Sequence, residues 1–266
     1  MLELYHHGVS ACAAKVRLAL AEKRLSWTSR YVDIFAGEQF NPAFLALNPK
    51  AVVPVLIHNN AVISESTAIC EYLEEVFADD PIYPSSPAAR ATVLHWTKAV
   101  DEELHPACAA ISYAISFRHT ILRQGARQYE EFMKLGPAEG SAARALKWQW
   151  INLGLDAPGT ADKIRLCDGY LHEMDEALKS NVWLAGPDFS MADIAVAPYV
   201  NRLAALSMDG LWTRGRLMNV ESWIERARLR PTFKPALVDW VPTDLAAEMS
   251  THGERSWPAV AAMLGL

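Results

Sequence analysis

The sequence lacks several features that would narrow its function at once. Its four cysteines are spread along the chain and form no CxxC pair, so neither a disulfide framework nor a zinc site is indicated and we expect no metal. No cluster of Lys and Arg is long enough for a phosphate-binding surface, and the net charge is −6, which argues against a nucleic-acid partner. No apolar run approaches a membrane span, and the first residues show no signal-peptide pattern. These absences favour a cytoplasmic protein with reduced thiols and no membrane partner.

The chain has 266 residues, a length that fits two compact domains, and 51% of them are hydrophobic, enough for a well-buried core. Periodicity over the first 77 residues predicts alternating short strands and helices. The strands are expected at 2–6, 27–32, 55–57 and 61–64, and the helices at 13–24, 41–47 and 66–77. The order β-α-β-α-β-β-α resembles the thioredoxin-like fold.

Beyond a segment with three prolines the pattern becomes helical. Helices are predicted over 88–124, 162–179, 190–206 and 220–227, with a short one after Pro231. The region 125–160 is less regular, and the tail from Trp240 shows no clear periodicity. We therefore predict an α/β thioredoxin-like domain over 1–80, a linker over 81–87 and an all-α domain over 88–266. Ser190 and Asp193 form a capping-box pattern, for which we expect a role in folding.

Two short motifs in the N-terminal half point to a ligand. Pro54 stands just before a predicted strand, where a proline fits only at a strand start, an edge or a bulge, or in a cis bond. Glu65 and Ser66 open the helix at 66–77 and offer a carboxylate, a hydroxyl and free N–H groups. Such a set suits the ammonium and carboxylate of one α-amino acid group. The arrangement resembles the glutathione-binding half of the cytosolic glutathione transferases.

The resemblance implies glutathione as co-substrate, a glutathione transferase fold and a homodimer. It assigns the γ-glutamyl end of glutathione to Glu65 and Ser66, and the cysteinyl part to the backbone of Val53 ahead of Pro54. It places two further residues, Gln39 and Lys50, near the glycine carboxylate. Lys50 is also compatible with a solvated loop charge, and Ser66 with a simple helix cap.

Two residues compete for the role of activating the glutathione thiol. The segment from Ser10 to Arg17 resembles the serine-type families, which places the Ser10 hydroxyl next to the sulfur. Cys12 is the alternative, because a helix N-terminus lowers a thiol pKa and a cysteine can form a mixed disulfide with glutathione. We favour Ser10, although it is also compatible with a helix cap, and Cys12 with a small buried residue. The neighbouring His6 and His7 suggest no metal site, because adjacent strand residues point to opposite faces.

Three further segments are similar to the bacterial glutathione-dependent β-aryl etherases of the F type. These segments are 65–77, 96–102 and 146–148. That resemblance implies that glutathione thiolate displaces a phenolate at the carbon next to a ketone in lignin-derived β-aryl ethers. The etherase pattern carries an asparagine near the position of Cys12 and a serine near that of Ala13, so this chain departs from it in the activating loop.

Aromatic side chains in the helical half are candidates for binding a hydrophobic aromatic electrophile. Tyr113 and Phe117 share one face of the long predicted helix. Trp148 lies in the 125–160 region, together with three other aromatic residues, Trp150, Tyr129 and Phe132. Core packing is the default explanation for each of these residues. Three other functions stay open: a general detoxifying transferase, a thiol transferase that uses Cys12, and a non-catalytic binder of glutathione or another ligand.

Overall fold

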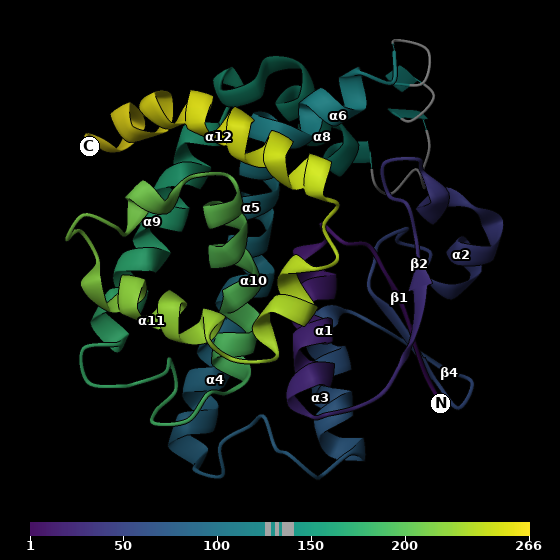
Figure 1. Ribbon diagram of the computed structural model, residues 1–266. Helices are drawn as coiled ribbons and strands as arrows, with labels where there is room; N and C mark the ends of the chain where they lie inside the picture. Colours follow the sequence, from purple (N-terminus) through teal and green to yellow (C-terminus); the bar gives the residue numbers. More distant parts are fainter. Residues whose placement is uncertain (126–128, 131–132, 135–140) are drawn as a thin grey trace.

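The computed structural model describes residues 1–125, 129–130, 133–134 and 141–266 (Figure 1). One sheet has the strand order β2-β1-β3-β4. Strands β1 and β2 are parallel, whereas β3 is antiparallel to both β1 and β4. Among the predicted aromatic residues, Phe132 lies outside the described part of the chain. The elements of the first half are β1 (Leu2–His6), α1 (Ala11–Glu22), β2 (Thr28–Tyr31), η1 (Glu38–Phe40), α2 (Pro42–Leu47), β3 (Val55–His58), β4 (Ala61–Ser64) and α3 (Ser66–Val76).

The predicted order β-α-β-α-β-β-α is confirmed, and the physical reason is visible in the burial pattern. In β1 the side chains of Leu2, Leu4 and His6 are buried, as alternation predicts for a strand packed on one face. Helix α1 is buried from Ala13 to Leu20, because it lies between α3 and a helix of the second half. Helix α2 covers the other face of the sheet through Phe44.

The second half of the chain is helical (Figure 1). The elements are α4 (Pro87–Ala99), η2 (Val100–Leu104), α5 (His105–Ser112), η3 (Tyr113–Phe117), α6 (Arg118–Leu122), α8 (Ser141–Leu153), η5 (Gly154–Asp156), α9 (Thr160–Ala177), α10 (Met191–Ala205), η6 (Asp209–Leu211), α11 (Met218–Arg228), η7 (Lys234–Val238) and α12 (Thr243–Leu264). None of the described helices is long and apolar enough to cross a membrane. The thioredoxin-like sheet followed by this helical half confirms the predicted fold class.

The long predicted helix is continuous but contains two π-helical turns, η2 and η3. Pro106 follows the first turn and has no N–H to donate to the carbonyl four residues earlier, which explains the local change of hydrogen-bond pattern. The capping box of α10 is confirmed: Ala192 N donates to Ser190 Oγ over 3.3 Å, and Ser190 N donates to Asp193 Oδ2 over 3.0 Å.

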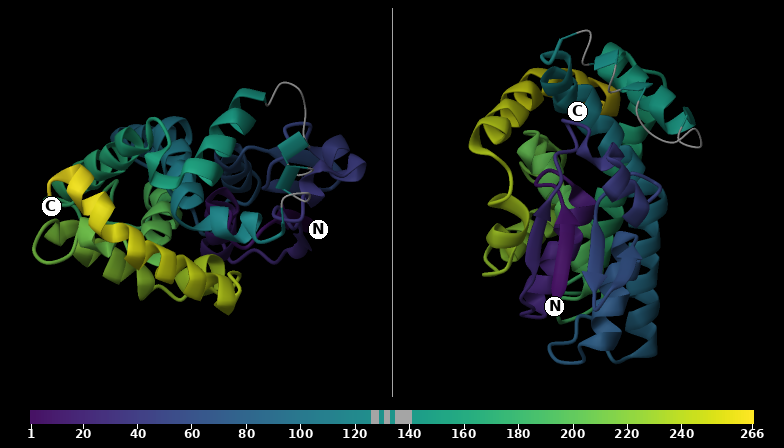
Figure 2. Two further views of the ribbon diagram at one scale, coloured as in Figure 1. Left: turned by 90° about the horizontal axis from the view of Figure 1, so that it is seen from above. Right: turned by 90° about the vertical axis from the view of Figure 1, so that its right-hand side faces the viewer.

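The tail, which shows no clear periodicity in the sequence, forms a helix over residues 243–264. Helix α12 packs against η3, α9 and α10, and Figure 2 shows it along the outside of the helical half. Its apolar residues fall into two groups separated by the polar stretch 250–256, which hid the periodicity. A Cβ at Gly253 would lie 1.7 Å from the carbonyl oxygen of Leu206, so the glycine permits the close approach to α10.

The hydrophobic core runs without interruption from the sheet into the helical half. Leu4 and Leu18 of the first half and Val196 of α10 belong to one buried cluster. The first half ends its last helix at Val76 and the second begins at Pro87. The division of the chain into two domains, 1–80 and 88–266, joined by a linker over 81–87, remains a proposal, because the two parts share one core.

Candidate functional site

Four loops meet at one edge of the sheet. The register pairs Tyr5 of β1 with Val55 of β3, and Val55 in turn with Ser64 of β4. His6 at the end of β1 also pairs with Tyr31 at the end of β2. The loops after β1, after β2, before β3 and after β4 therefore leave the sheet side by side. These loops carry predicted site residues that are far apart in sequence: Ser10, Gln39, Val53, Pro54, Glu65 and Ser66.

Ser10 is the N-cap of α1, as one of its two predicted roles requires. Its Oγ accepts a hydrogen bond from Ala13 N over 3.2 Å. Because the backbone N–H occupies an acceptor position of the hydroxyl, the hydroxyl proton stays available for another acceptor. The side chain is half-buried at the positive end of a 12-residue helix, a position that favours a negative charge nearby.

Two buried guanidinium groups hold the loop that leads to Ser10. Arg17 donates to the carbonyl oxygens of His7 and Gly8, both over 3.2 Å, and Arg202 of α10 donates to that of Val9. Burial lowers the pKa of Arg17 to about 9 and also lowers the pKa of Arg202. Arg17 therefore keeps its positive charge at neutral pH.

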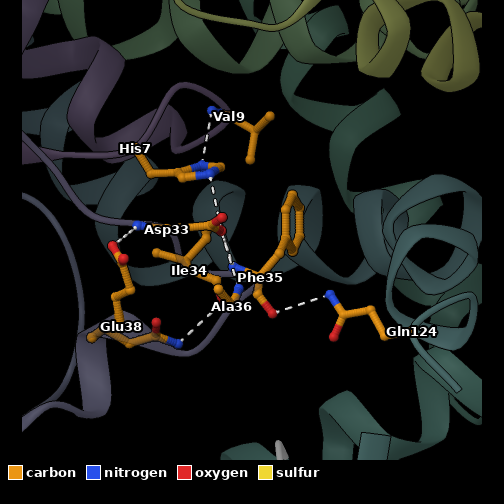
Figure 3. A network of polar contacts seen from close by, with 9 residues as sticks. His7, Val9, Asp33, Ile34, Phe35, Ala36, Glu38 and Gln124 are labelled. Carbon is orange, nitrogen blue, oxygen red and sulfur yellow. Dashed lines mark hydrogen bonds and ion pairs between the residues drawn. The ribbon is translucent and has the colours of Figure 1, made fainter. Parts of the chain in front are cut away.

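The loop after β2 is fixed by a polar network (Figure 3). Asp33 Oδ1 accepts from the backbone N–H groups of Phe35 and Ala36 over 2.9 and 3.0 Å, and Glu38 Oε2 accepts from Asp33 N over 2.7 Å. The same Asp33 oxygen lies 3.9 Å from Nε2 of His7, in the loop after β1. The two loops therefore lie side by side at this point.

The two histidines at the end of β1 are neutral. Burial, followed by the charge of Arg17, lowers the pKa of His6 to about 3. Burial is also the largest cause that lowers the pKa of His7 to about 4, although Asp33 opposes it. His6 lies between Ser29 and Arg17, whereas His7 faces Val9 and Asp33. The described residues contain no group of three or more His, Cys, Asp or Glu side chains that could hold a metal ion.

The residues predicted for the γ-glutamyl and cysteinyl parts of glutathione lie at adjacent loop ends. The peptide bond between Val53 and Pro54 is cis, which is one of the arrangements that the sequence left open. Val53 precedes β3 and stands outside the sheet ladder. Glu65 has a φ of +67°, a region that non-glycine residues rarely adopt and that recurs at functional sites. Ser66 begins α3 and is 7% exposed.

The two residues predicted for the glycine carboxylate are placed differently. Lys50 is exposed, and its Nζ lies 2.7 Å from Oε1 of Glu65, so its charge stands at the rim of the loop cluster. The Glu65 bond is the largest cause that raises the pKa of Lys50. Gln39 is buried, and its Nε2 donates to the carbonyl oxygen of Ile34 over 3.2 Å. Its Oε1 is buried without a hydrogen-bond partner among the described residues.

Cys12 faces the helical half of the molecule. Its Sγ lies 3.4 Å from Nδ1 of His105 on α5 and 3.5 Å from the hydroxyl oxygen of Tyr199 on α10. Burial alone would raise the pKa of the Cys12 thiol, but the charge and hydrogen bond of His105, with Lys15 and Tyr199, outweigh it and lower the pKa to about 7. The His105 pKa is raised, because the Cys12 charge and hydrogen bond outweigh the lowering effect of burial.

Sequence reasoning missed both partners of Cys12. His105 is 93 positions away and Tyr199 is 187 positions away, and neither belongs to a local motif. Lys15 Nζ also contacts both halves of the chain, because it lies 2.8 Å from Oδ1 of Asp101 in the helical half and 2.9 Å from Oγ1 of Thr67 in α3. All four cysteines are free thiols, and Cys12 alone is not fully buried.

The three residues predicted to bind the electrophile lie near the junction of η3 and α8. The rings of Tyr113 and Phe117 are 5.5 Å apart. Phe117 is buried and lies 5.3 Å from the ring of Phe35, beneath the guanidinium of Arg202 at 5.0 Å. Trp148 of α8 is 47% exposed.

A cavity of about 720 Å³ borders Ser10. Its walls are the loop at Gly8 and Ser10, one face of α10, residues 233–239 and the first turns of α12. The predicted electrophile residues do not line it. Sequence reasoning missed this cavity because the tail that forms much of its wall showed no periodicity.

Two family models match this chain. The model described as "Glutathione S-transferase, N-terminal domain" matches residues 9–76, and the one described as "Glutathione S-transferase, C-terminal domain" matches residues 157–240. Together they span more than half of the chain. Their order follows the order of the two halves of the fold.

Similar proteins and structures point to the same superfamily. Protein LigF of Sphingobium sp. (strain NBRC 103272 / SYK-6) is 29% identical over 238 residues, which cover 88% of this chain and 91% of LigF. The tetrachloro-p-hydroquinone reductive dehalogenase of Sphingobium chlorophenolicum is 28% identical over 241 residues, which cover 89% of this chain and 96% of that protein.

The crystal structure of β-etherase LigF superposes with a TM-score of 0.80 over 88% of this chain and 98% of that one, at 29% identity. Glutathione transferase F7 of Populus trichocarpa gives 0.68 over 89% and 97%, at 27% identity. The matched family models, the fold and the four loops at one edge of the sheet lead to one conclusion: this chain belongs to the glutathione S-transferase superfamily.

Proposed function

We propose that this protein is a glutathione transferase that cleaves β-aryl ether bonds of lignin-derived aromatic compounds. The observation that carries the proposal is the meeting of Ser10, Val53, Glu65 and Ser66 at one edge of the sheet, imposed by the strand register. Similarity to LigF, whose structure is described as that of a β-etherase, supports the choice of substrate.

In this proposal the γ-glutamyl group of glutathione binds at Glu65 and Ser66, and its cysteinyl part binds beside Val53 and Pro54. The glycine carboxylate lies toward Lys50 and Gln39. Its thiol then lies at the N-terminus of α1, where the hydroxyl of Ser10 donates a hydrogen bond to the sulfur. A donor and a helix N-terminus both favour the thiolate.

The thiolate sulfur attacks the ether carbon next to the ketone and forms a carbon–sulfur bond. The carbon–oxygen bond breaks, and its electron pair leaves with the phenolate, which takes up a proton to give the phenol. The proton of the glutathione thiol is released to solvent when the thiolate forms. Orientation of the ether carbon in line with the sulfur and stabilisation of the charge that develops on the phenolate both lower the barrier.

The experiment is phenol release from a fluorescent β-aryl ether, with each enantiomer, in the presence and absence of glutathione. We expect release only with glutathione. Ser10→Ala should lower the rate roughly 10- to 100-fold, the effect of losing a hydrogen bond to a charged group, whereas Cys12→Ser should retain it. Clear glutathione binding without phenol release would refute the ether substrate and leave a general detoxifying transferase or a non-catalytic binder.

A second candidate, a thiol transferase, rests on Cys12 with His105 and Tyr199 within 3.5 Å of its sulfur. In that reaction the Cys12 thiolate attacks the glutathione sulfur of a mixed disulfide and releases the substrate thiolate. A second glutathione thiolate then attacks the Cys12–glutathione disulfide and forms oxidised glutathione. Loss of this activity in Cys12→Ser, with Ser10→Ala unaffected, would favour the thiol transferase over the etherase.

We also propose a homodimer in the cytoplasm, as the family resemblance implies. The aromatic electrophile would bind toward Tyr113, Phe117 and Trp148 or in the cavity beside Ser10. Sedimentation equilibrium of the purified chain tests the dimer: a mass near 29.5 kDa rather than twice that value would contradict it.

A further inference from the structure

The turn that leads into α1 is closed twice by one residue, His7. Its backbone carbonyl oxygen accepts a hydrogen bond from Ser10 N over 3.2 Å. Its ring nitrogen Nδ1 accepts from Val9 N, also over 3.2 Å (Figure 3). Asparagine and aspartate commonly bind the N–H two residues later in the same way at the start of a turn. In this turn an imidazole nitrogen supplies that acceptor.

The surroundings of the imidazole favour one orientation. His7 is only 3% exposed, and its ring lies 5.1 Å from the ring of Tyr31 and 5.4 Å from that of Phe35. Its Nε2 lies 3.9 Å from Oδ1 of Asp33. Because Nδ1 accepts the N–H of Val9, the neutral ring carries its proton on Nε2, the nitrogen nearer the carboxylate. The acceptor nitrogen therefore stays turned toward the backbone of the turn.

The carbonyl oxygens of the turn are bound by other parts of the chain. Arg17 donates to the carbonyl oxygen of Gly8 over 3.2 Å, and Arg202 donates to that of Val9. A Cβ at Gly8 would lie 2.0 Å from the carbonyl oxygen of Trp240, so the turn packs closely against this C-terminal segment. The two arginines thus hold carbonyl oxygens of the turn, whereas His7 accepts one of its N–H groups.

The direction of the Ser10 hydroxyl depends on this turn. Ser10 follows Val9 and is the N-cap of α1, where its Oγ accepts from Ala13 N over 3.2 Å. A side chain that must also donate to a sulfur has to be held to within roughly 0.5 Å. Loss of the His7 acceptor would release the peptide group between Gly8 and Val9 and leave a buried N–H unpaired, which favours rearrangement of the turn.

We propose that His7 is a positioning residue for the serine that activates the glutathione thiol, and that it acts through its acceptor nitrogen Nδ1. The inference rests on the proposed function, because it concerns the same Ser10 hydroxyl. In this role the imidazole supplies an acceptor to the backbone and transfers no proton. Asparagine at position 7 can supply the same acceptor, whereas the longer glutamine side chain places its amide near the position of Nε2.

The test is a pH titration of the thiolate absorbance of bound glutathione. It uses a Cys12→Ser background, because the Cys12 thiol would otherwise add to the signal. His7→Gln should raise the pKa of the bound thiol by at least about 0.5 pH unit, toward its value in Ser10→Ala. His7→Asn should keep most of the wild-type value. An unchanged pKa in His7→Gln, or an equal rise in His7→Asn, would overturn the proposal.

His58→Gln is the matched control for a general loss of stability. His58 is also partly buried, and its Nδ1 lies 2.8 Å from the hydroxyl oxygen of Tyr72, but it pairs with Leu2 at the opposite end of the sheet. This variant should leave the pKa of the bound thiol unchanged, and a rise equal to that in His7→Gln would refute a positioning role. His7→Ser keeps the test decisive if His7→Gln fails to fold. Its hydroxyl makes the same contact more weakly, so the pKa should lie between those of the wild type and Ser10→Ala.

Amide hydrogen exchange without glutathione separates this inference from the proposed function. The Val9 amide, followed by nuclear magnetic resonance, should exchange about 3- to 10-fold faster in His7→Gln than in the wild type, and His7→Asn should restore slow exchange. Equal exchange in all three proteins would overturn the role of Nδ1. A wild-type protein whose bound glutathione titrates like free glutathione would refute the proposed function, and with it the part of His7 in thiol activation. The exchange rates would still decide whether His7 fixes the turn.

Discussion

The reactivity of Cys12 should depend on His105, across the junction of the two halves. The sulfur lies 3.4 Å from Nδ1 of the imidazole, which is the strongest of the influences that lower the pKa of Cys12 to about 7 from its ordinary value of 9.0. His105→Asn removes that charge but keeps the side chain polar and of similar size. The pKa of Cys12 should therefore rise toward its ordinary value of 9.0, because burial continues to disfavour the thiolate while Lys15 and Tyr199 still favour it.

The size of the effect follows from two opposing factors. At pH 7 a thiol with a pKa of about 7 is about half ionised, and one with a pKa of about 9 is about 1% ionised, a roughly 50-fold loss of thiolate. A thiolate of higher pKa is the better nucleophile, and a Brønsted coefficient of about 0.45 makes it roughly 8-fold more reactive. Cys12 of His105→Asn should therefore be alkylated about 6-fold more slowly than Cys12 of the wild type at pH 7. At pH 10, where both thiols are ionised, it should be alkylated several-fold faster.

The assay is the rate of alkylation of Cys12 by iodoacetamide from pH 5.5 to 10, followed by mass spectrometry of the intact protein. The other three cysteines are buried and their pKa values are raised, chiefly by burial, so the native protein should react at one site. His95→Asn is the matched control, because His95 is exposed and pairs with Glu173 away from Cys12. Superimposable pH profiles for His105→Asn and the wild type would refute the reasoning.

Two further predictions concern stability. Gly253→Ala should lower the free energy of unfolding by about 1–3 kcal/mol, because its Cβ would lie 1.7 Å from the carbonyl oxygen of Leu206. The control is Gly169→Ala in α9, where an added Cβ meets no atom within 4 Å, so this variant should be neutral or stabilising by up to ~1 kcal/mol. Thermal unfolding measures both variants, and an equal loss of stability in the two would contradict the packing argument. Asp193→Ala should lower the free energy of unfolding in urea by about 3–5 kcal/mol, because the buried carboxylate of Asp193 accepts four hydrogen bonds. Asp188 is exposed, and Asp188→Ala should change this free energy by less than about 0.5 kcal/mol. Similar values for the two variants would argue against the capping network.

Much of the fold could be predicted because its signals are local. Alternation marks β1, and apolar residues at i, i+3 and i+4 mark α3. The four-residue segment from Ser190 to Asp193 contains a complete capping signal, which the structure bears out. The π-helical turns and α12 could not be predicted in this way, because apolar periodicity does not mark a change of hydrogen-bond pattern within a helix and is not clear in the tail.

The candidate site shows the same contrast between local motifs and contacts from distant parts of the chain. Ser10, Val53 and the pair Glu65–Ser66 each belong to a short motif, and the strand register then brings the motifs together. The environment of Cys12 depends on His105 of α5 and on α10, and no periodicity reports such a contact. The cavity beside Ser10 escaped prediction for the same reason.

The most direct test of the central claim is the ionisation of bound glutathione, followed by the ultraviolet absorbance of the thiolate as the pH is raised. The measurement belongs in a Cys12→Ser background, because the Cys12 thiol itself has a pKa of about 7 and would add to the signal. We predict that the bound thiol titrates at least about 1 pH unit below an ordinary thiol at roughly 8.5, and that Ser10→Ala abolishes most of this shift. A bound thiol that titrates like free glutathione, or a shift that survives Ser10→Ala unchanged, would contradict the account.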